Sequence, residues 1–465
     1  MSMFRKKLVI EQGTSGLDRC LSALDLTLLG IGAIVGAGIF VFTGHAAAHY
    51  AGPAIVLSFV VSGLACAFAA LAYAELASTF GGCGSAYGYA YAGIGELVAW
   101  IIGWDLILEY GVSIPSVAIG WSGYVANALT ALGIPLPASL VHGPWETNDP
   151  GILNFPAMAI IVLLAGLLSI GVRVSAQVNT VMVFVKLLTI TVFVALAVGN
   201  VNIDHWTPFM PNGWSGVTQG AAVVFFAYIG FDAVSTAAEE AKNPSRDLPI
   251  GIIGSLAVCT VIYIVVAALL TGIVPYQTLA SPSPVADALL RIGYRWGSAM
   301  ISTGAIAGLT TVMLVLYYGL TRIFLAMARD GLLPKMFATI HPRSHTPVRV
   351  ILVVGVFMAL IAGFAPVERI IELVNIGTLA AFVLVCTGVI LLRRTHPDLP
   401  RPFRTPGNPI IPLLGIAFCL YLMFSLPIVT WERFMVWLVL GLVVYFSYSQ
   451  QHSTLAASGI SAGPR

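Results

Sequence analysis

Twelve apolar stretches of roughly 20 residues or more constrain the fold of this 465-residue chain more than any other feature. A helix needs about 20 apolar residues to cross the hydrocarbon core of a bilayer. The stretches cover residues 24–50, 53–79, 95–127, 154–172, 175–199, 217–238, 249–274, 297–328, 348–365, 369–392, 409–427 and 431–449. They lack the period-2 alternation of a membrane β-barrel, so they predict membrane-spanning helices.

The composition points the same way. The chain has 22 basic and 20 acidic residues, together 9% of its length, whereas soluble proteins average about 25%. So few charges could not cover a soluble globule that is 58% hydrophobic. This excludes a soluble enzyme, a secreted disulfide scaffold and a disordered protein. We predict an all-α polytopic membrane protein with 12 transmembrane helices.

The basic residues predict the orientation of these helices. Twelve crossings place both termini on one side, and 17 of the 22 Lys and Arg residues fall there. They lie in 1–23, in the loops after the fourth, sixth and tenth stretches, in the region from the end of the eighth stretch (Arg322) to the start of the ninth (Arg349), and in the tail 451–465. The other side has Arg291, Arg295, Arg369 and Arg433. Because cytoplasmic loops are enriched in Lys and Arg, we expect a multi-pass protein of the cell (plasma or inner) membrane with both termini in the cytoplasm.

The first stretch contains a cluster of glycines in the sequence GIGAIVGAGIF. Gly36, Ala37 and Gly38 are three consecutive residues with little or no side chain, and each glycine weakens a helix by about 1 kcal/mol relative to alanine. The cluster can serve close helix packing, since Gly32 and Gly36 form a small-xxx-small pair. It can equally mark a break in the helix near residues 34–38.

A second interruption in the sixth stretch favours the break. The sequence YIGFD, residues 228–232, puts an aspartate near mid-membrane depth, where a charge is expensive. Asp232 is reasonable there if it caps the N-terminus of a second half-helix. Matching interruptions in helices 1 and 6 indicate two inverted repeats with a binding site between them. We place these repeats at 24–199 (helices 1–5) and 200–392 (helices 6–10), followed by two helices at 393–450.

Two broken helices have the chemistry to bind a free α-amino acid. The N-terminal end of a half-helix offers unpaired N–H groups and suits a carboxylate. The C-terminal end of the other half offers carbonyl groups and suits an ammonium. A free amino acid carries both groups on one carbon, so this receptor needs no charged side chain.

At these residues the sequence resembles the amino acid–polyamine–organocation superfamily, and within it the bacterial cationic amino acid transporter-like family. The resemblance rests on GAIVGAGIF, GFDAVSTAAEEAKNPSRDLP and RIFLAMARDGLLP, and extends from about residue 18 to 450. It implies the LeuT-type fold, with two inverted five-helix repeats plus two C-terminal helices. It also implies that Gly36, Ala37 and Gly38 bind the substrate carboxylate, and that the amino group is bound by the carbonyls of Ile34, Phe226, Ala227 and Ile229.

Lys186 is a basic residue about eleven positions into the fifth stretch, too deep for easy snorkelling. The resemblance implies that it replaces the sodium ion of sodium-coupled relatives, so the proton is the expected coupling ion and sodium is not. The alternative is a permanent cation that ties helix 5 to the carbonyls of helix 1. We hypothesise that Lys186→Ala abolishes proton-driven uptake. We expect no metal and no other cofactor.

Other charges within or beside the stretches are also candidates. Glu109 lies in the third stretch and is either part of a proton path or a hydrogen-bond partner of neighbouring helices; Asp105, four residues earlier, shares its helical face. Glu75, Glu239 and Glu240 are expected to pair with Lys242, Arg246 or Arg329 at an inner gate.

The substrate side chain is expected to meet Phe231, Leu316 and Tyr317, although helix packing explains the tyrosine equally well. No acidic residue other than Asp232 is evident at that depth, which favours neutral, small to medium amino acids over cationic ones.

The prediction for function is therefore a secondary active importer of α-amino acids that works by proton symport and alternating access. An exchanger of the same fold and a non-transporting amino acid sensor are the alternatives. A channel would need a ring of polar filter motifs, and an enzyme would need a catalytic constellation within the stretches; the sequence has neither. The expected partners are the amino acid and the lipid bilayer, with no nucleic acid. We expect a monomer, and the sequence does not specify a small membrane subunit or a sterol contact.

Overall fold

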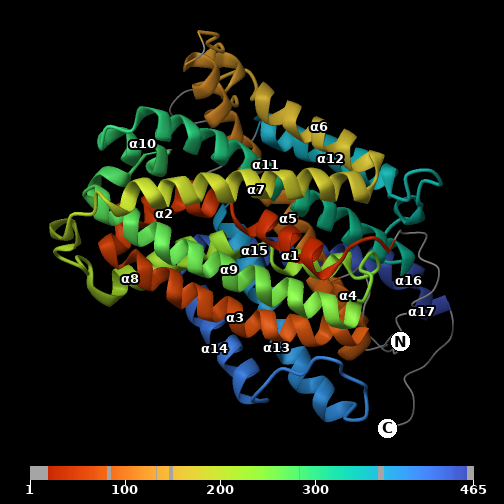
Figure 1. Ribbon diagram of the computed structural model, residues 1–465. Coiled ribbons are helices and arrows are strands. Elements are labelled where there is room, and N and C mark those ends of the chain that lie inside the picture. The colour runs from red at the N-terminus through yellow and green to blue at the C-terminus, as the bar shows by residue number, and fades with distance from the viewer. Residues whose placement is uncertain are drawn as a thin grey trace.

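A computed structural model describes residues 19–80, 85–131, 133–145, 150–281, 283–364 and 371–457. The predicted cytoplasmic residues 1–18 and 458–465 lie outside the described residues, as does Arg369. The long helices are α1 (Ala23–Ile34), α3 (Ile55–Phe80), α5 (Glu96–Ala131), α6 (Phe155–Ile170), α7 (Val172–Val198), α8 (Gly213–Val224), α9 (Pro244–Ile273), α11 (Arg295–Arg329), α12 (Val348–Phe364), α13 (Ile371–Thr395), α14 (Ile410–Phe424) and α15 (Ile428–Val444). The short ones are α2 (Thr43–Ala46), α4 (Ser85–Gly93), α10 (Pro284–Arg291), α16 (Gln450–His452) and α17 (Thr454–Ala457) (Figure 1).

The predicted all-α membrane fold is confirmed. Eight helical stretches of the described chain are long and apolar enough to cross a membrane. One of them, Ala23–Phe80, is 58 residues long and contains the first two predicted crossings. The shorter apolar helices α6, α12 and α14 coincide with three other predicted crossings. The number of crossings, twelve, stays a prediction.

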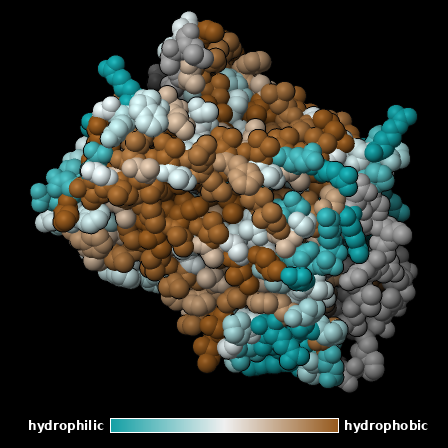
Figure 2. All heavy atoms as spheres, in the orientation of Figure 1, coloured by the Kyte–Doolittle hydropathy of each residue, from teal (hydrophilic) through white to brown (hydrophobic). Residues whose placement is uncertain are grey.

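The surface has the distribution of apolar residues that a bilayer requires. Figure 2 shows a broad hydrophobic band, with hydrophilic residues gathered mainly beyond its edges. Large apolar side chains of α7 and α15 are exposed, including Val181, Phe184 and Val436, each at least 60% exposed. A soluble protein rarely exposes so large a contiguous apolar surface.

The helices pack in a pattern that suits two repeats. α3 packs against α9, α5 against α11 and α6 against α12, so several helices touch the helix five crossings later in the predicted order. A two-fold relation between two five-helix units produces such pairs. The division into repeats at 24–199 and 200–392 stays a prediction.

The two helices with glycine motifs are interrupted. α1 ends at Ile34, and Val35 has extended backbone angles before η1 (Gly38–Phe42) begins. In the second, α8 is followed by η6 (Phe225–Tyr228), an extended residue at Ile229 and η7 (Asp232–Ala237). The end of the molecule that contains residues 19–22 and 330–333 is called the inner face and is predicted to be cytoplasmic. The end that contains residues 133–145 and α10 is called the outer face.

Candidate functional site

The two interruptions touch each other, and glycine permits the contact. A Cβ added to Gly38 would lie 2.2 Å from the Cβ of Ala227 and 2.3 Å from its Cα. Gly230 has a φ of +117°, a conformation that favours glycine, and an added Cβ would lie 2.7 Å from the Cβ of Ala33. Any larger residue at these positions would push the two broken helices apart.

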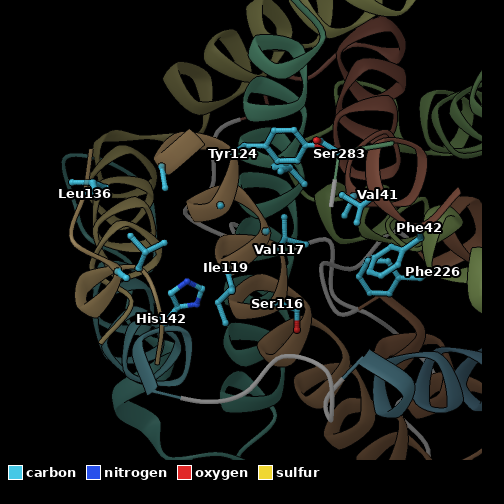
Figure 3. Close-up of a pocket in the computed structure, with 17 residues that line it drawn as sticks. Val41, Phe42, Ser116, Val117, Ile119, Tyr124, Leu136, His142, Phe226 and Ser283 are labelled. Carbon is cyan, nitrogen blue, oxygen red and sulfur yellow. The ribbon is translucent and has the colours of Figure 1, made fainter. Parts of the chain in front are cut away.

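A cavity of about 570 Å³ extends from these interruptions to the outer face. Ala37 and Phe226 line it at the interruptions, and His142 lines it near the outer face. The rings of Phe42 and Phe226 lie edge to face with centroids 5.2 Å apart. Figure 3 shows this pair at one end of the cavity and His142 with Leu136 at the other. Because the cavity reaches the outer loops, the structure offers an entry for a small solute from that face.

Two of the four carbonyl groups predicted to bind an amino group, those of Ile34 and Ala227, lie together. The hydroxyl of Tyr263 in α9 lies 2.6 Å from the carbonyl oxygen of Ile34 and 2.8 Å from that of Ala227. One hydroxyl donates one hydrogen at a time, and a carbonyl oxygen can accept two. Tyr263 therefore holds acceptors from both broken helices side by side and leaves acceptor capacity for a ligand ammonium.

The three residues predicted to bind a carboxylate lie at the start of the outer half of the first broken helix. Ala37 immediately precedes η1, Gly38 is its first residue, and the carbonyl of Gly36 accepts from Phe40 N–H at 3.2 Å. The first N–H groups of a helix have no partner within it and form an anion site. Ala37 also lines the cavity, so these groups lie at its wall.

Lys186 of α7 is fully buried beneath the first interruption. Its Nζ donates to the carbonyl oxygens of Ile31 (2.8 Å), Gly32 (3.1 Å) and Val35 (2.9 Å), and to Oγ1 of Thr311 in α11 (3.0 Å). An ammonium has three hydrogens, so these four acceptors exceed what it can serve at once. Lys186 therefore binds a cluster of carbonyl groups where α1 ends, and it joins three helices at that point.

Asp232 lies inside the second half-helix rather than at the N-cap position that the sequence predicts. Phe231 is the residue before η7 and Asp232 is the first residue within it. Oδ1 of Asp232 accepts from the N–H of Gly230 at 3.2 Å, and Oδ2 accepts from the hydroxyl of Tyr110 in α5. The prediction of an N-cap is corrected accordingly, because the carboxylate reaches back to the N–H that the interruption leaves unpaired.

Glu109 and Asp105 are both buried on α5. A hydrogen bond joins Glu109 to Thr378 of α13, whereas its Oε1 and the Oδ1 of Asp105 have no hydrogen-bond partner among the described residues. Asp105 faces α13, since a Cβ added to Gly377 would lie 2.7 Å from its Oδ1. The carboxyl groups therefore lie between α5 and α13, and neither residue lines the outer cavity.

The side-chain pocket that the sequence predicts differs from the observed cavity, which Phe231, Leu316 and Tyr317 do not line. The Phe231 ring packs between Tyr73 and Phe382, at 5.8 and 5.1 Å. The Tyr317 hydroxyl donates to the carbonyl of Ile351 in α12, so the helix-packing alternative is right. Leu309 is the α11 residue at the cavity.

Helical geometry explains this correction. Each residue turns the helix by about 100° and advances it by about 1.5 Å. Leu316 therefore shares the face of Leu309 but lies about 10 Å nearer the inner face, and Tyr317 is rotated by about 80° away from it.

The inner side of the interruptions is closed by ion pairs. Arg322 of α11 and Glu240 pair at 2.7 Å, each 1% exposed, and Arg329 pairs with Glu239 at 3.0 Å. The pair between Arg329 and Glu239 agrees with the prediction for the inner gate. Glu240, however, pairs with Arg322 and not with Lys242 or Arg246. Arg322 is also buried within a helix, as Lys186 is.

Glu75 has different partners from those expected as well. It receives two hydrogen bonds from Arg393 at the end of α13, at 2.9 and 2.6 Å, and one from Thr405 N–H at 2.7 Å. Arg401 lies 3.4 Å from it, and partial burial lowers the pKa of that guanidinium. These contacts tie the loop after α13 to the inner end of α3.

Sequence reasoning missed Tyr263, Tyr110 and Thr311. Each is a hydroxyl within an apolar helix, and a buried hydroxyl needs a partner. The depth of Tyr263 in the run VCTVIYIVVAALL was a usable signal. The direction in which the Tyr263 side chain points could not be predicted, because nothing in the run indicates which carbonyl groups its hydroxyl contacts.

These features define an integral membrane transporter rather than an enzyme: an entry cavity on one side, a closed inner face, and two interrupted helices in contact between them. The chain belongs to the amino acid permease family, whose sequence profile matches residues 21–445. The predicted membership in the amino acid–polyamine–organocation superfamily is thereby confirmed.

Relatives from bacteria and animals match nearly the whole chain. It is 50% identical to the branched-chain amino acid permease BcaP of Bacillus subtilis over 461 residues, covering 98% of this chain and 99% of that one. It is 48% identical to the methylthioribose transporter of the same organism over 458 residues, with coverage of 98% and 99%. It is 32% identical to human cationic amino acid transporter 4 over 561 residues, with coverage of 94% and 88%.

Proposed function

We propose that this protein imports neutral α-amino acids with apolar side chains across a cell membrane, by proton symport and alternating access. The observation that carries the proposal is the cavity at the two interruptions. No Asp, Glu, Lys or Arg is among the residues that line it, while Ala37, just before the outer half of the first broken helix, and Phe226 of the second lie in its wall. A lysine or arginine side chain would lose its hydration there without gaining a counter-charge.

The relatives support a neutral substrate. BcaP is named for branched-chain amino acids and the methylthioribose transporter for a neutral sugar derivative, and both are more similar to this chain than the human cationic amino acid transporter is. A branched aliphatic side chain fits a wall that includes Val41, Val117 and Leu309.

Lys186 supports the proton as the coupling ion. Its ammonium occupies the carbonyl cluster at the end of α1, where a sodium ion would otherwise find oxygen ligands. A lysine can release its proton when α1 moves away and its acceptors are lost. The orientation with both termini in the cytoplasm is part of the proposal, as is import rather than exchange.

Counterflow in liposomes tests the substrate. Purified protein is reconstituted with unlabelled substrate inside, and entry of radiolabelled leucine, valine, alanine, lysine, arginine and methylthioribose is measured. We expect saturable counterflow of the neutral amino acids and little of the cationic ones. Absence of counterflow across the panel would refute transport, and a preference for lysine or arginine would refute the neutral pocket. An amino acid sensor would bind leucine without counterflow.

A further inference from the structure

A second cavity, also of about 570 Å³, lies at the inner face and shares no lining residue with the first. It is bounded by the start of α1, the first turns of α7 and the segment after η7. Its polar wall contains Asp25, Arg173, Gln177, Thr180 and Lys242. None of the residues predicted to bind the substrate lines this cavity.

The cavity has two cations available for an anionic ligand. Arg173 and Lys242 are exposed, and within the described part of the chain neither forms an ion pair. The one acidic residue, Asp25, is already engaged: its Oδ2 accepts from the N–H and the hydroxyl of Ser22, at 2.9 and 2.6 Å. The cavity therefore offers more positive charge than it neutralises.

One side of the cavity is continuous with the lipid-facing surface. Val181 lines it and is 64% exposed. Phe184 and Leu188 continue along α7 toward the middle of the membrane, at 60% and 61% exposure. An anion that fits both parts has a charged head and apolar chains, because a basic pocket beside membrane helices at the cytoplasmic side suits an acidic headgroup.

We propose that this cavity binds an anionic phospholipid of the inner leaflet, with its phosphate between Arg173 and Lys242 and an acyl chain along α7. A free phosphate would use the two cations but not the apolar surface of Val181, Phe184 and Leu188.

The bound lipid would hold together elements that meet at the closed inner face. The N–H groups of Cys20 and Leu21 donate to the carbonyl of Glu240, both at 3.0 Å, and Lys242 N–H donates to the carbonyl of Leu21 at 2.8 Å. The start of α1 is thus attached to the segment that carries Lys242. A headgroup that also contacts Arg173 joins this unit to α7 and stabilises the closed inner face.

The test measures lipid binding to full-length protein purified and delipidated in a neutral detergent. Phosphatidylglycerol and phosphatidylcholine with identical chains are titrated while melting temperature and bound lipid are recorded, the latter by native mass spectrometry. The test variant is Arg173→Gln with Lys242→Gln. The matched control is Arg394→Gln with Arg404→Gln, which removes two exposed cations at the end of α13 and just beyond it, on the other side of the molecule from α7 in Figure 1.

We expect phosphatidylglycerol to raise the melting temperature of the wild type and of the control variant more than phosphatidylcholine does. In the test variant its apparent affinity should fall by about 30-fold, since each basic residue near an anionic lipid contributes about fivefold. Equal losses in both variants, or none in the test variant, would overturn the site. Glycerophosphoglycerol, the headgroup without chains, should have little effect; an equal effect would show an anion site and overturn the lipid. Transport activity enters none of these readouts, so failure of the proposed function leaves this test intact.

Discussion

The contact between the two interrupted helices predicts that Gly38→Ala weakens substrate binding strongly. The added Cβ would lie 2.2 Å from the Cβ of Ala227 and 2.3 Å from its Cα, whereas non-bonded carbon atoms rest about 3.5–4.0 Å apart. The Ala227 backbone cannot rotate away as a flexible side chain could. The two segments must therefore separate by more than about 1 Å.

The magnitude follows from the strain. Overpacking of this kind costs about 1–3 kcal/mol, and a substrate that needs both segments in their native positions must restore the strained contact. The dissociation constant should rise by about 5- to 150-fold. The assay is substrate-concentration dependence of leucine counterflow, with protein folding checked by gel filtration.

Gly120→Ala is the matched control. It makes the same chemical change in the wall of the same cavity, but its Cβ would meet nothing within 4 Å. We expect its half-saturating leucine concentration to stay within about twofold of wild type, because the change adds no contact. If Gly38→Ala bound leucine as tightly as Gly120→Ala, the substrate would not depend on the contact between the interruptions.

Three further changes test other parts of the structure. Tyr263→Phe removes the hydroxyl near the carbonyls of Ile34 and Ala227, and should raise the half-saturating concentration in counterflow by about fivefold, the value of one hydrogen bond; an unchanged concentration would remove Tyr263 from the site. Glu240→Gln removes the acidic partner of the buried Arg322 and should destabilise the protein by about 3–5 kcal/mol. Glu239→Gln, whose pair with Arg329 is partly exposed, should cost below about 1 kcal/mol. Chemical unfolding measures both, and equal effects would contradict the difference in burial. Ser453→Ala removes the 2.5 Å hydrogen bond to Glu96 and should speed hydrogen exchange in residues 445–457 while leaving α1 unaffected; unchanged exchange would show that Ser453 does not hold this segment.

The sequence was sufficient for the helices because their lengths and apolar character follow directly from the thickness of a bilayer. It also located both interruptions, since closely spaced glycines, and an aspartate at mid-membrane depth, are costly in an unbroken helix. Gly36, Gly38 and Asp232 therefore predicted where the chain departs from helical geometry.

The directions of side chains could not be obtained in the same way. Tyr317 and Leu309 lie on the same helix, and only the packing of α11 against α12 determines that Tyr317 turns away from the cavity. Charge pairing across distant segments is equally hidden: Glu75 pairs with Arg393, more than 300 positions later. Arg322 looked like a loop cation near the end of a stretch, yet it is buried against Glu240.

Coupling through Lys186 is the central claim, and uptake driven by a pH gradient tests it most directly. Liposomes with an alkaline interior receive radiolabelled leucine without sodium, with wild-type protein or with Lys186→Gln, which keeps N–H donors for the carbonyls at the end of α1 but carries no titratable proton. We predict that wild-type protein accumulates leucine until a protonophore is added, and that Lys186→Gln retains counterflow but does not accumulate leucine. Accumulation by Lys186→Gln at the wild-type rate, or wild-type uptake indifferent to the gradient, would contradict the claim.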